Sequence, residues 1–129
     1  MKYNKEDYIN YRKSKSEEVF MDAVLLADNN RWNSSVNRLY YSSYYLASAL
    51  LYQNDIKADT HNGVKIQLFL NFVKTGKLSK NLGKLYSHLF DWRQETDYAD
   101  FIEFDESIVK PLIKDVEELN NKLKELLNS

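Results

Sequence analysis

SSVNRLYYSSYYLASALLY, residues 34–52, has the composition of a helix that lies at the centre of a helical bundle. Its apolar side chains cover most of the circumference of a helix: Val36, Leu39, Tyr40, Tyr44, Ala47, Leu50 and Leu51. A helix that is apolar nearly all round has to be covered by neighbouring elements on several sides. This segment therefore predicts an all-α protein built around residues 34–52.

Four flanking segments have the 3.6-residue apolar periodicity that covering helices need. We expect them at about residues 5–28, 61–73, 79–95 and 106–127. The last segment carries an apolar seam at alternating spacings of three and four residues: Val109, Leu112, Val116, Leu119, Leu123 and Leu126. Three Gly and one Pro leave few chain breaks, so we expect an up-down antiparallel bundle of four to five helices, with residues 1–129 forming one domain.

Short polar residues mark the expected helix ends. Asn4 and Thr60 are placed to cap the helices that follow them, and the run 33–35 (Asn-Ser-Ser) offers caps for the central helix. Gly76 is suited to the left-handed position that ends a helix. Pro111 must lie near the start of the last helix or kink it.

Composition describes a soluble globular protein, with 43% hydrophobic and 29% charged residues. No cysteine is present, no segment approaches a membrane span, and the first residues lack the apolar run of a signal peptide. We therefore expect a cytoplasmic protein with no membrane association.

The charges are unevenly placed although the net charge is −1. Residues 57–84 hold six lysines against one acid, and residues 85–106 hold seven acids against one arginine. The lysines could contact phosphates, or the two groups could be solvated surfaces of opposite sign.

Arg93 is the strongest candidate for chemistry. The periodicity of residues 79–95 places it on the core side of its helix, and a guanidinium is a permanent charge whose planar fork clamps phosphate or carboxylate. The alternative is a structural ion pair with Asp97, Glu95 or Asp100.

His61 and His88 are the only histidines. His61 follows Thr60 at a helix start, where an imidazole can transfer protons near neutral pH, whereas His88 is expected on the surface or between helices. Two separate histidines give no metal-binding spacing, and no cofactor motif is present, so we expect neither a metal nor a cofactor.

Tyrosines crowd the central helix at Tyr40, Tyr41, Tyr44, Tyr45 and Tyr52. Such side chains can stack on bases of a single-stranded nucleic acid. They can equally fill the core or a dimer interface, where tyrosine is enriched.

Several of these segments together resemble the HEPN domain family, the small helical "higher eukaryotes and prokaryotes nucleotide-binding" proteins. The matching segments are NRLYY (37–41), ASALL (47–51), THNGV (60–64), FVKTGKL (72–78) and RQETDY (93–98). The resemblance implies a helical bundle that forms a homodimer, often beside a nucleotidyltransferase partner in a toxin–antitoxin-like pair.

Site residues follow from the same resemblance. Arg93 matches the motif arginine, and Tyr98 stands at the first position where the motif histidine could follow it. Asn37 or Arg38 occupies the place of a polar helper, with Tyr41 and Asp97 as further binding residues. Tyr98 would also be the acceptor if the partner adenylylates a tyrosine.

Three functions follow as hypotheses. The first is a dimeric module that binds a nucleotidyltransferase, RNA or a nucleotide through Arg93. The second is a metal-independent RNA endonuclease in which Arg93 stabilises the scissile phosphate and His61 or Tyr98 moves protons. The third is a structural adaptor in which Arg93 is held in an ion pair.

Overall fold

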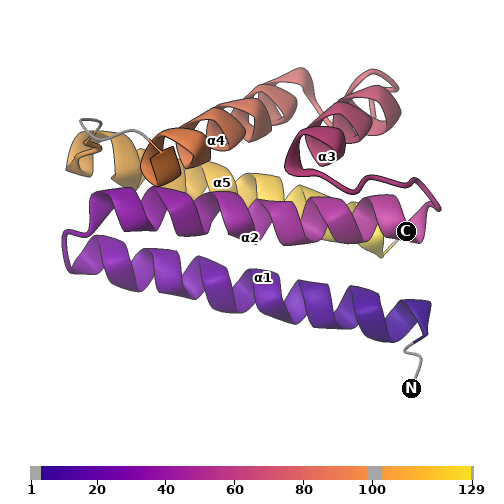
Figure 1. Ribbon diagram of the computed structural model, residues 1–129, viewed down its shortest axis with the longest axis horizontal. Coiled ribbons are helices and arrows are strands. Elements are labelled where there is room, and N and C mark those ends of the chain that lie inside the picture. Colours follow the sequence, from indigo (N-terminus) through magenta and orange to yellow (C-terminus); the bar gives the residue numbers. More distant parts are fainter. Residues whose placement is uncertain (1–3, 99–102, 129) are drawn as a thin grey trace.

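The computed structural model describes residues 4–98 and 103–128, and these residues form a bundle of α-helices without strands (Figure 1). The elements in chain order are α1 (Lys5–Asp28), α2 (Trp32–Gln53), α3 (His61–Leu68), a π-helical segment η1 (Phe69–Val73), α4 (Lys80–Tyr98) and α5 (Glu106–Leu127). Successive long helices run in opposite directions, so the predicted all-α, up-down bundle is confirmed (Figure 1).

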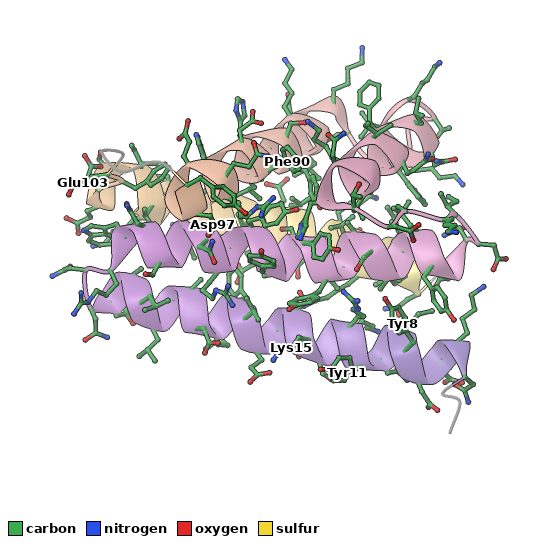
Figure 2. All side chains as sticks on the ribbon, in the orientation of Figure 1. Tyr8, Tyr11, Lys15, Phe90, Asp97 and Glu103 are labelled. Atoms are coloured by element: carbon green, nitrogen blue, oxygen red, sulfur yellow. The ribbon has the colours of Figure 1, made fainter. Side chains whose placement is uncertain are left out.

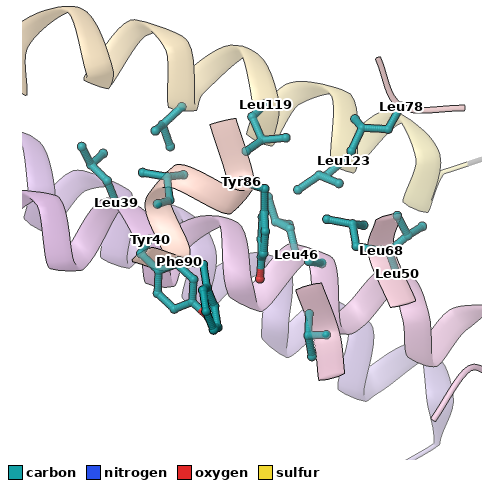
Figure 3. Close-up of a cluster of buried hydrophobic side chains, with 14 of the residues drawn as sticks. Leu39, Tyr40, Leu46, Leu50, Leu68, Leu78, Tyr86, Phe90, Leu119 and Leu123 are labelled. Atoms are coloured by element: carbon teal, nitrogen blue, oxygen red, sulfur yellow. The ribbon is translucent and has the colours of Figure 1, made fainter. Parts of the chain in front are cut away.

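The central position of α2 is confirmed as well. It packs against α1, α3, α4 and α5, and its core residues Leu39, Tyr40 and Leu46 are fully buried. Figure 3 shows Tyr40 in the same cluster of buried side chains as Tyr86 of α4 and Leu119 of α5. The side chains of three helices therefore pack together around Tyr40.

Two of the three predicted caps are present. Asn4 accepts a hydrogen bond from the Asp7 backbone N–H, and Thr60 accepts one from Gly63. Gly76 has the predicted left-handed backbone, with φ of 83°.

The predicted cap of the central helix is wrong. The helix begins at Trp32, after Arg31, which makes no side-chain cap hydrogen bond. Asn33 instead accepts a hydrogen bond from the Phe104 backbone N–H at 2.8 Å, and Ser35 donates to the Ala23 carbonyl at 2.8 Å. These side chains tie the start of α2 to neighbouring segments because α2 is covered on several sides.

Two other boundaries differ from the sequence prediction. The segment expected as one helix over 61–73 changes at Phe69 into a π-helical turn, in which the Lys74 N–H donates to the Phe69 carbonyl at 2.8 Å. Helix α4 continues three residues beyond 95, so Asp97 and Tyr98 remain helical.

In α5, Pro111 lies inside the second turn, and the seam ends on buried Leu127 rather than Leu126. The seam also contains a polar residue that the spacing did not indicate. Asn120 is buried, accepts a hydrogen bond from Ser43 at 2.7 Å and donates to Ser42 at 3.0 Å. This cluster fixes the position of α5 against α2, because a shift along the helix would leave buried polar groups unpaired.

No helix in the described part of the chain combines the length and the apolar character that crossing a bilayer requires.

Candidate functional site

Arg93 lies in α4 with its guanidinium turned towards the core, as the periodicity predicts. The residue is only 8% exposed, and its guanidinium carbon lies 5.4 Å from the centre of the Tyr40 ring and 5.9 Å from that of Phe90. Both distances are within the range of cation–π attraction. Both aromatic rings therefore stabilise the charge.

Asp97, one turn further along α4, is the ion-pair partner of Arg93. The Arg93 Nη1 and the Asp97 Oδ2 are 3.4 Å apart, and the buried Nε of Arg93 has no hydrogen-bond partner among the described residues. Glu95 makes no recorded contact with Arg93, and Asp100 lies outside the described residues. The ion pair with Asp97 thus exists, but it uses only part of the donor capacity of the guanidinium.

Asn37 and Arg38 of α2 complete the polar surroundings of Asp97. The Asn37 amide donates to Asp97 Oδ1 at 2.9 Å, and Arg38 donates to Asn37 Oδ1 at 2.7 Å. Arg38 also lies over the ring of Tyr41, 4.9 Å from its centre. The chain of contacts from Arg93 to Arg38 joins four of the predicted site residues.

A shallow pocket of about 370 Å³ opens beside this chain of contacts. It lies between the first turns of α2 and the last turns of α4, and the residues that line it are Leu26, Asn33, Ser34, Asn37, Arg38, Thr96 and Asp97. Figure 2 shows Asp97 beside the first half of α2. We call this pocket together with the guanidinium of Arg93 the Arg93 site.

His61 reaches the same region from the start of α3. Its Nδ1 lies 2.8 Å from the Tyr40 hydroxyl, and its ring stacks on Tyr44 with 4.3 Å between ring centres. Tyr40 therefore contacts both His61, through its hydroxyl, and Arg93, through its ring face. The two candidate residues are 32 positions apart in sequence, but one buried side chain connects them.

Burial lowers the pKa of His61, and the positive charge of Arg93 lowers it further, while Asp97 acts in the opposite direction. His61 is therefore predominantly neutral at pH 7. Burial raises the pKa of Tyr40 well above its ordinary value, so its hydroxyl stays protonated. Because a hydroxyl both donates and accepts, it can bind Nδ1 of either neutral tautomer, and Nε2 remains able to accept or to donate a proton.

Tyr98 lies at the last residue of α4, where its side chain is 78% exposed. Tyr98 contacts neither Arg93 nor His61. Among the described residues, His61 is therefore the predicted proton-transfer residue that lies near Arg93, and Tyr98 does not lie there. His88 is exposed and stacks on Trp92, away from the Arg93 site, as expected.

No group of His, Cys, Asp or Glu side chains in residues 4–98 and 103–128 has the arrangement of a metal site.

The family model for the HEPN domain matches residues 9–126. The chain belongs to the HEPN domain family. The resemblance inferred from the motifs is therefore confirmed, and the match extends the HEPN region over α1 and α5, well beyond the segments that suggested it.

Relatives of this HEPN domain protein come from bacteria and archaea. A UPF0332 protein of Thermotoga maritima is 39% identical over 95% of this chain and 93% of its own length. A protein of Methanocaldococcus jannaschii named a putative toxin is 32% identical over 81% of this chain and 75% of its own. A second protein of that organism with the same description is 29% identical over 87% and 86%.

Sequence reasoning did not single out the role of Tyr40 at the Arg93 site or the contacts of Arg12. Tyr40 was assigned to the core, which is correct, but its contacts with His61 and Arg93 were not foreseen. Arg12 of α1 lies over the rings of Tyr8 and Tyr45, at 5.0 and 5.3 Å from their centres. The i, i+4 spacing of Tyr8 and Arg12 was the available signal.

Proposed function

We propose that this HEPN domain protein is the toxin-like subunit of a toxin–antitoxin-like pair, and that its dimer binds a phosphate-bearing ligand, RNA or a nucleotide, at the Arg93 site. The names of the Methanocaldococcus relatives support the first part. The second part rests on the chemistry of Arg93.

The observation that carries the proposal is the incomplete pairing of a buried guanidinium. An arginine has five N–H donors, and charge-assisted hydrogen bonds are usually about 2.7–2.9 Å long. The 3.4 Å contact with Asp97 is longer, and it is the only hydrogen bond that the Arg93 guanidinium makes within residues 4–98 and 103–128. A structural ion pair of a buried arginine normally has closer and more numerous bonds. Arg93 therefore keeps donors for an anion, and its partner Asp97 lines the neighbouring pocket.

The test is binding of fluorescein-labelled RNA and of ATP, measured by fluorescence anisotropy with wild type, Arg93→Gln and Arg31→Gln. Arg31 is an exposed arginine that precedes α2 and serves as the matched control. Loss of a charge-assisted contact predicts about tenfold or greater weakening in Arg93→Gln and little change in Arg31→Gln. Equal affinities of folded wild type and Arg93→Gln would show that Arg93 does not bind the ligand.

The second candidate function is metal-independent RNA cleavage, and the contact between His61 and Tyr40 favours it. The Nε2 of His61 would take the proton of the 2′-hydroxyl, and the resulting alkoxide would attack the adjacent phosphorus. Arg93 would stabilise the charge that develops on the phosphate oxygens. The bond from phosphorus to the 5′-oxygen then breaks, and that oxygen takes a proton from the protonated His61 or from water.

Cleavage is tested with total cellular RNA in EDTA. Wild type should cut, and Arg93→Ala and His61→Ala should not, whereas His88→Ala should cut normally because His88 lies elsewhere. Full cleavage by both Arg93→Ala and His61→Ala would exclude this mechanism. If wild type does not cleave RNA, ligand binding is the function that remains proposed.

Tyr98 is the proposed acceptor for adenylylation by a nucleotidyltransferase partner. Its exposed hydroxyl would attack the α-phosphate of ATP, forming a tyrosyl phosphodiester and releasing pyrophosphate. Intact-mass analysis after incubation with the transferase and ATP should show an added adenylyl group in wild type and none in Tyr98→Phe. An unchanged mass of the wild-type protein would contradict this part of the proposal.

The proposed dimer is supported by the charges on the outward side of α4. Lys80, Lys84, Asp91 and Glu95 lie along one side of the helix, and none has an ion-pair partner within the described chain. Lys80 and Glu95 are equally distant from the Ser87–His88 midpoint. Lys84 and Asp91 are also equally distant from it.

This symmetry makes the surface complementary to itself. When a second copy packs with its α4 antiparallel, each Lys84 faces the Asp91 of the other copy, and each Lys80 faces the Glu95. Such an arrangement is the two-fold symmetric interface most common in homodimers.

A further inference from the structure

We infer that the Arg93 site continues along α2 as a track of phosphate contacts for single-stranded RNA, formed by Arg93, Arg38 and Arg12. This inference rests on the proposed function, because it names the ligand class and extends the site to a residue on α1. We call these three arginines the phosphate track.

The arginines are connected by an unbroken series of ring contacts. Arg93 lies over Tyr40, whose ring is 5.9 Å from that of Tyr44. The Tyr44 ring lies 6.0 Å from that of Tyr45, and Arg12 lies over Tyr45. The positive charge of Arg12 acts on Tyr44, whose pKa is raised mainly by burial and lowered in part by this arginine.

Arg12 and Arg38 have the same arrangement. Each lies within cation–π distance of a tyrosine ring, and each makes one hydrogen bond to a neutral side chain: Arg12 to Ser48 at 3.2 Å and Arg38 to Asn37 at 2.7 Å. Neither has a carboxylate partner within 4–98 and 103–128. An arginine that stacks on a ring keeps the N–H groups at its edge for a phosphate, and the stacking fixes its orientation in advance.

The rings themselves are less available to bases. Tyr44 packs against both Tyr40 and His61, and the arginines lie over the rings of Tyr41 and Tyr45. The contacts therefore favour recognition of the phosphate backbone over stacking of several bases. Tyr11 is the exception, because it is 64% exposed beside Arg12.

The dimensions suit a short stretch of RNA. Arg38 and Tyr45, over which Arg12 lies, are seven residues apart on α2, which corresponds to about 10 Å along the helix. At about 3.4 Å per stacked nucleotide, this distance spans about three nucleotides. Beyond Arg12, a pocket of about 550 Å³ is lined by Asp7, Tyr8, Tyr11 and Arg12 and could receive the end of the strand. Figure 2 shows Tyr8 between α1 and the second half of α2, far along α2 from Asp97.

The experiment measures binding of labelled oligouridylates of about twelve and about three nucleotides over a series of salt concentrations. The variants are Arg12→Gln, Arg38→Gln and Arg93→Gln, with Arg31→Gln as the exposed control. For single strands, each lost phosphate contact should reduce the slope of log K against log salt by about 0.7. We expect this reduction and about three- to tenfold weaker binding of the long RNA in Arg12→Gln and Arg38→Gln.

The salt slope separates a phosphate contact from a structural role, because an arginine that only joins α1 to α2 changes stability without changing the slope. Unchanged slopes in Arg12→Gln and Arg38→Gln, with binding still lost in Arg93→Gln, would overturn the phosphate track alone. If wild type binds neither oligouridylate, the RNA-binding function fails together with the track. Association of copies that depends on Arg12, without any effect on RNA, would assign this surface to a protein interface and would also overturn the inference.

Discussion

The hydrogen bond between Tyr40 and His61 gives a sharp test of how the site is held together. Tyr40→Phe removes only the hydroxyl, which lies 2.8 Å from His61 Nδ1, and leaves the fully buried ring in place. A hydrogen bond of this kind contributes about 1 kcal/mol net, and a half-buried nitrogen left without a partner adds up to about 1 kcal/mol. We therefore expect Tyr40→Phe to lower the free energy of unfolding by about 1–2 kcal/mol, or the melting temperature by about 3–8 °C.

The adjacent tyrosine provides a matched control. Tyr41 is on the same helix, and its hydroxyl makes no hydrogen bond recorded for the described residues, so Tyr41→Phe should change stability by less than about 0.5 kcal/mol. Urea unfolding followed by circular dichroism gives both values. A double-mutant cycle with His61→Ala isolates the interaction, and we expect a coupling energy of at least about 0.5 kcal/mol. If Tyr40→Phe is as stable as Tyr41→Phe, Tyr40 does not position the imidazole.

Three further predictions address the bundle, the imidazole and the dimer. Asn120→Ala leaves the buried Ser43 hydroxyl without its acceptor and removes the bond to Ser42, whose hydroxyl still donates to the Leu39 carbonyl. It should cost about 2–4 kcal/mol in urea unfolding, whereas the exposed Asn121→Ala should cost less than about 0.5; similar values would refute the role of the buried amide. Because folding lowers the pKa of His61, the stability that its neutral form contributes should be complete above pH 6.5 and should be lost as the pH falls through the folded-state pKa. The free energy of unfolding should therefore fall with pH over this range in wild type but not in His61→Gln. Lys84→Asp should weaken the dimer about tenfold or more in sedimentation equilibrium, and adding Asp91→Lys should restore it; no rescue would reject the antiparallel α4 interface.

The bundle could be predicted from sequence because its determinants are local. The apolar circumference of residues 34–52 indicated the central helix, and the Asn4, Thr60 and Gly76 end signals act within a few residues of their positions. The cap predicted at 33–35 failed for a non-local reason, since Asn33 and Ser35 bond to Phe104 and Ala23, which only the tertiary fold brings near.

The candidate site also combines contacts that local spacing predicts with contacts that depend on the tertiary fold. Arg93 and Asp97 are one helical turn apart, so their contact followed from spacing. The contact of His61 with Tyr40 depends on the path of residues 54–60 between α2 and α3, which no periodicity determines. The buried Asn120 was hidden for a related reason, because its serine partners lie on a different helix.

If phosphate binds at Arg93 as proposed, the arrangement of Arg93 and His61 around Tyr40 couples that binding to protonation. Without a ligand, burial and the charge of Arg93 keep His61 neutral. A phosphate at Arg93 would offset that positive charge and bring a negative charge towards the imidazole, so the pKa of His61 should rise in the complex. Linkage is reciprocal, and protonated His61 should therefore bind phosphate more tightly than the neutral form. A proton acceptor beside a phosphate has to be neutral before binding and easily protonated afterwards, and His61 would meet both requirements. The buried Tyr40 hydroxyl serves both states, because it can donate to Nδ1 in one and accept from it in the other.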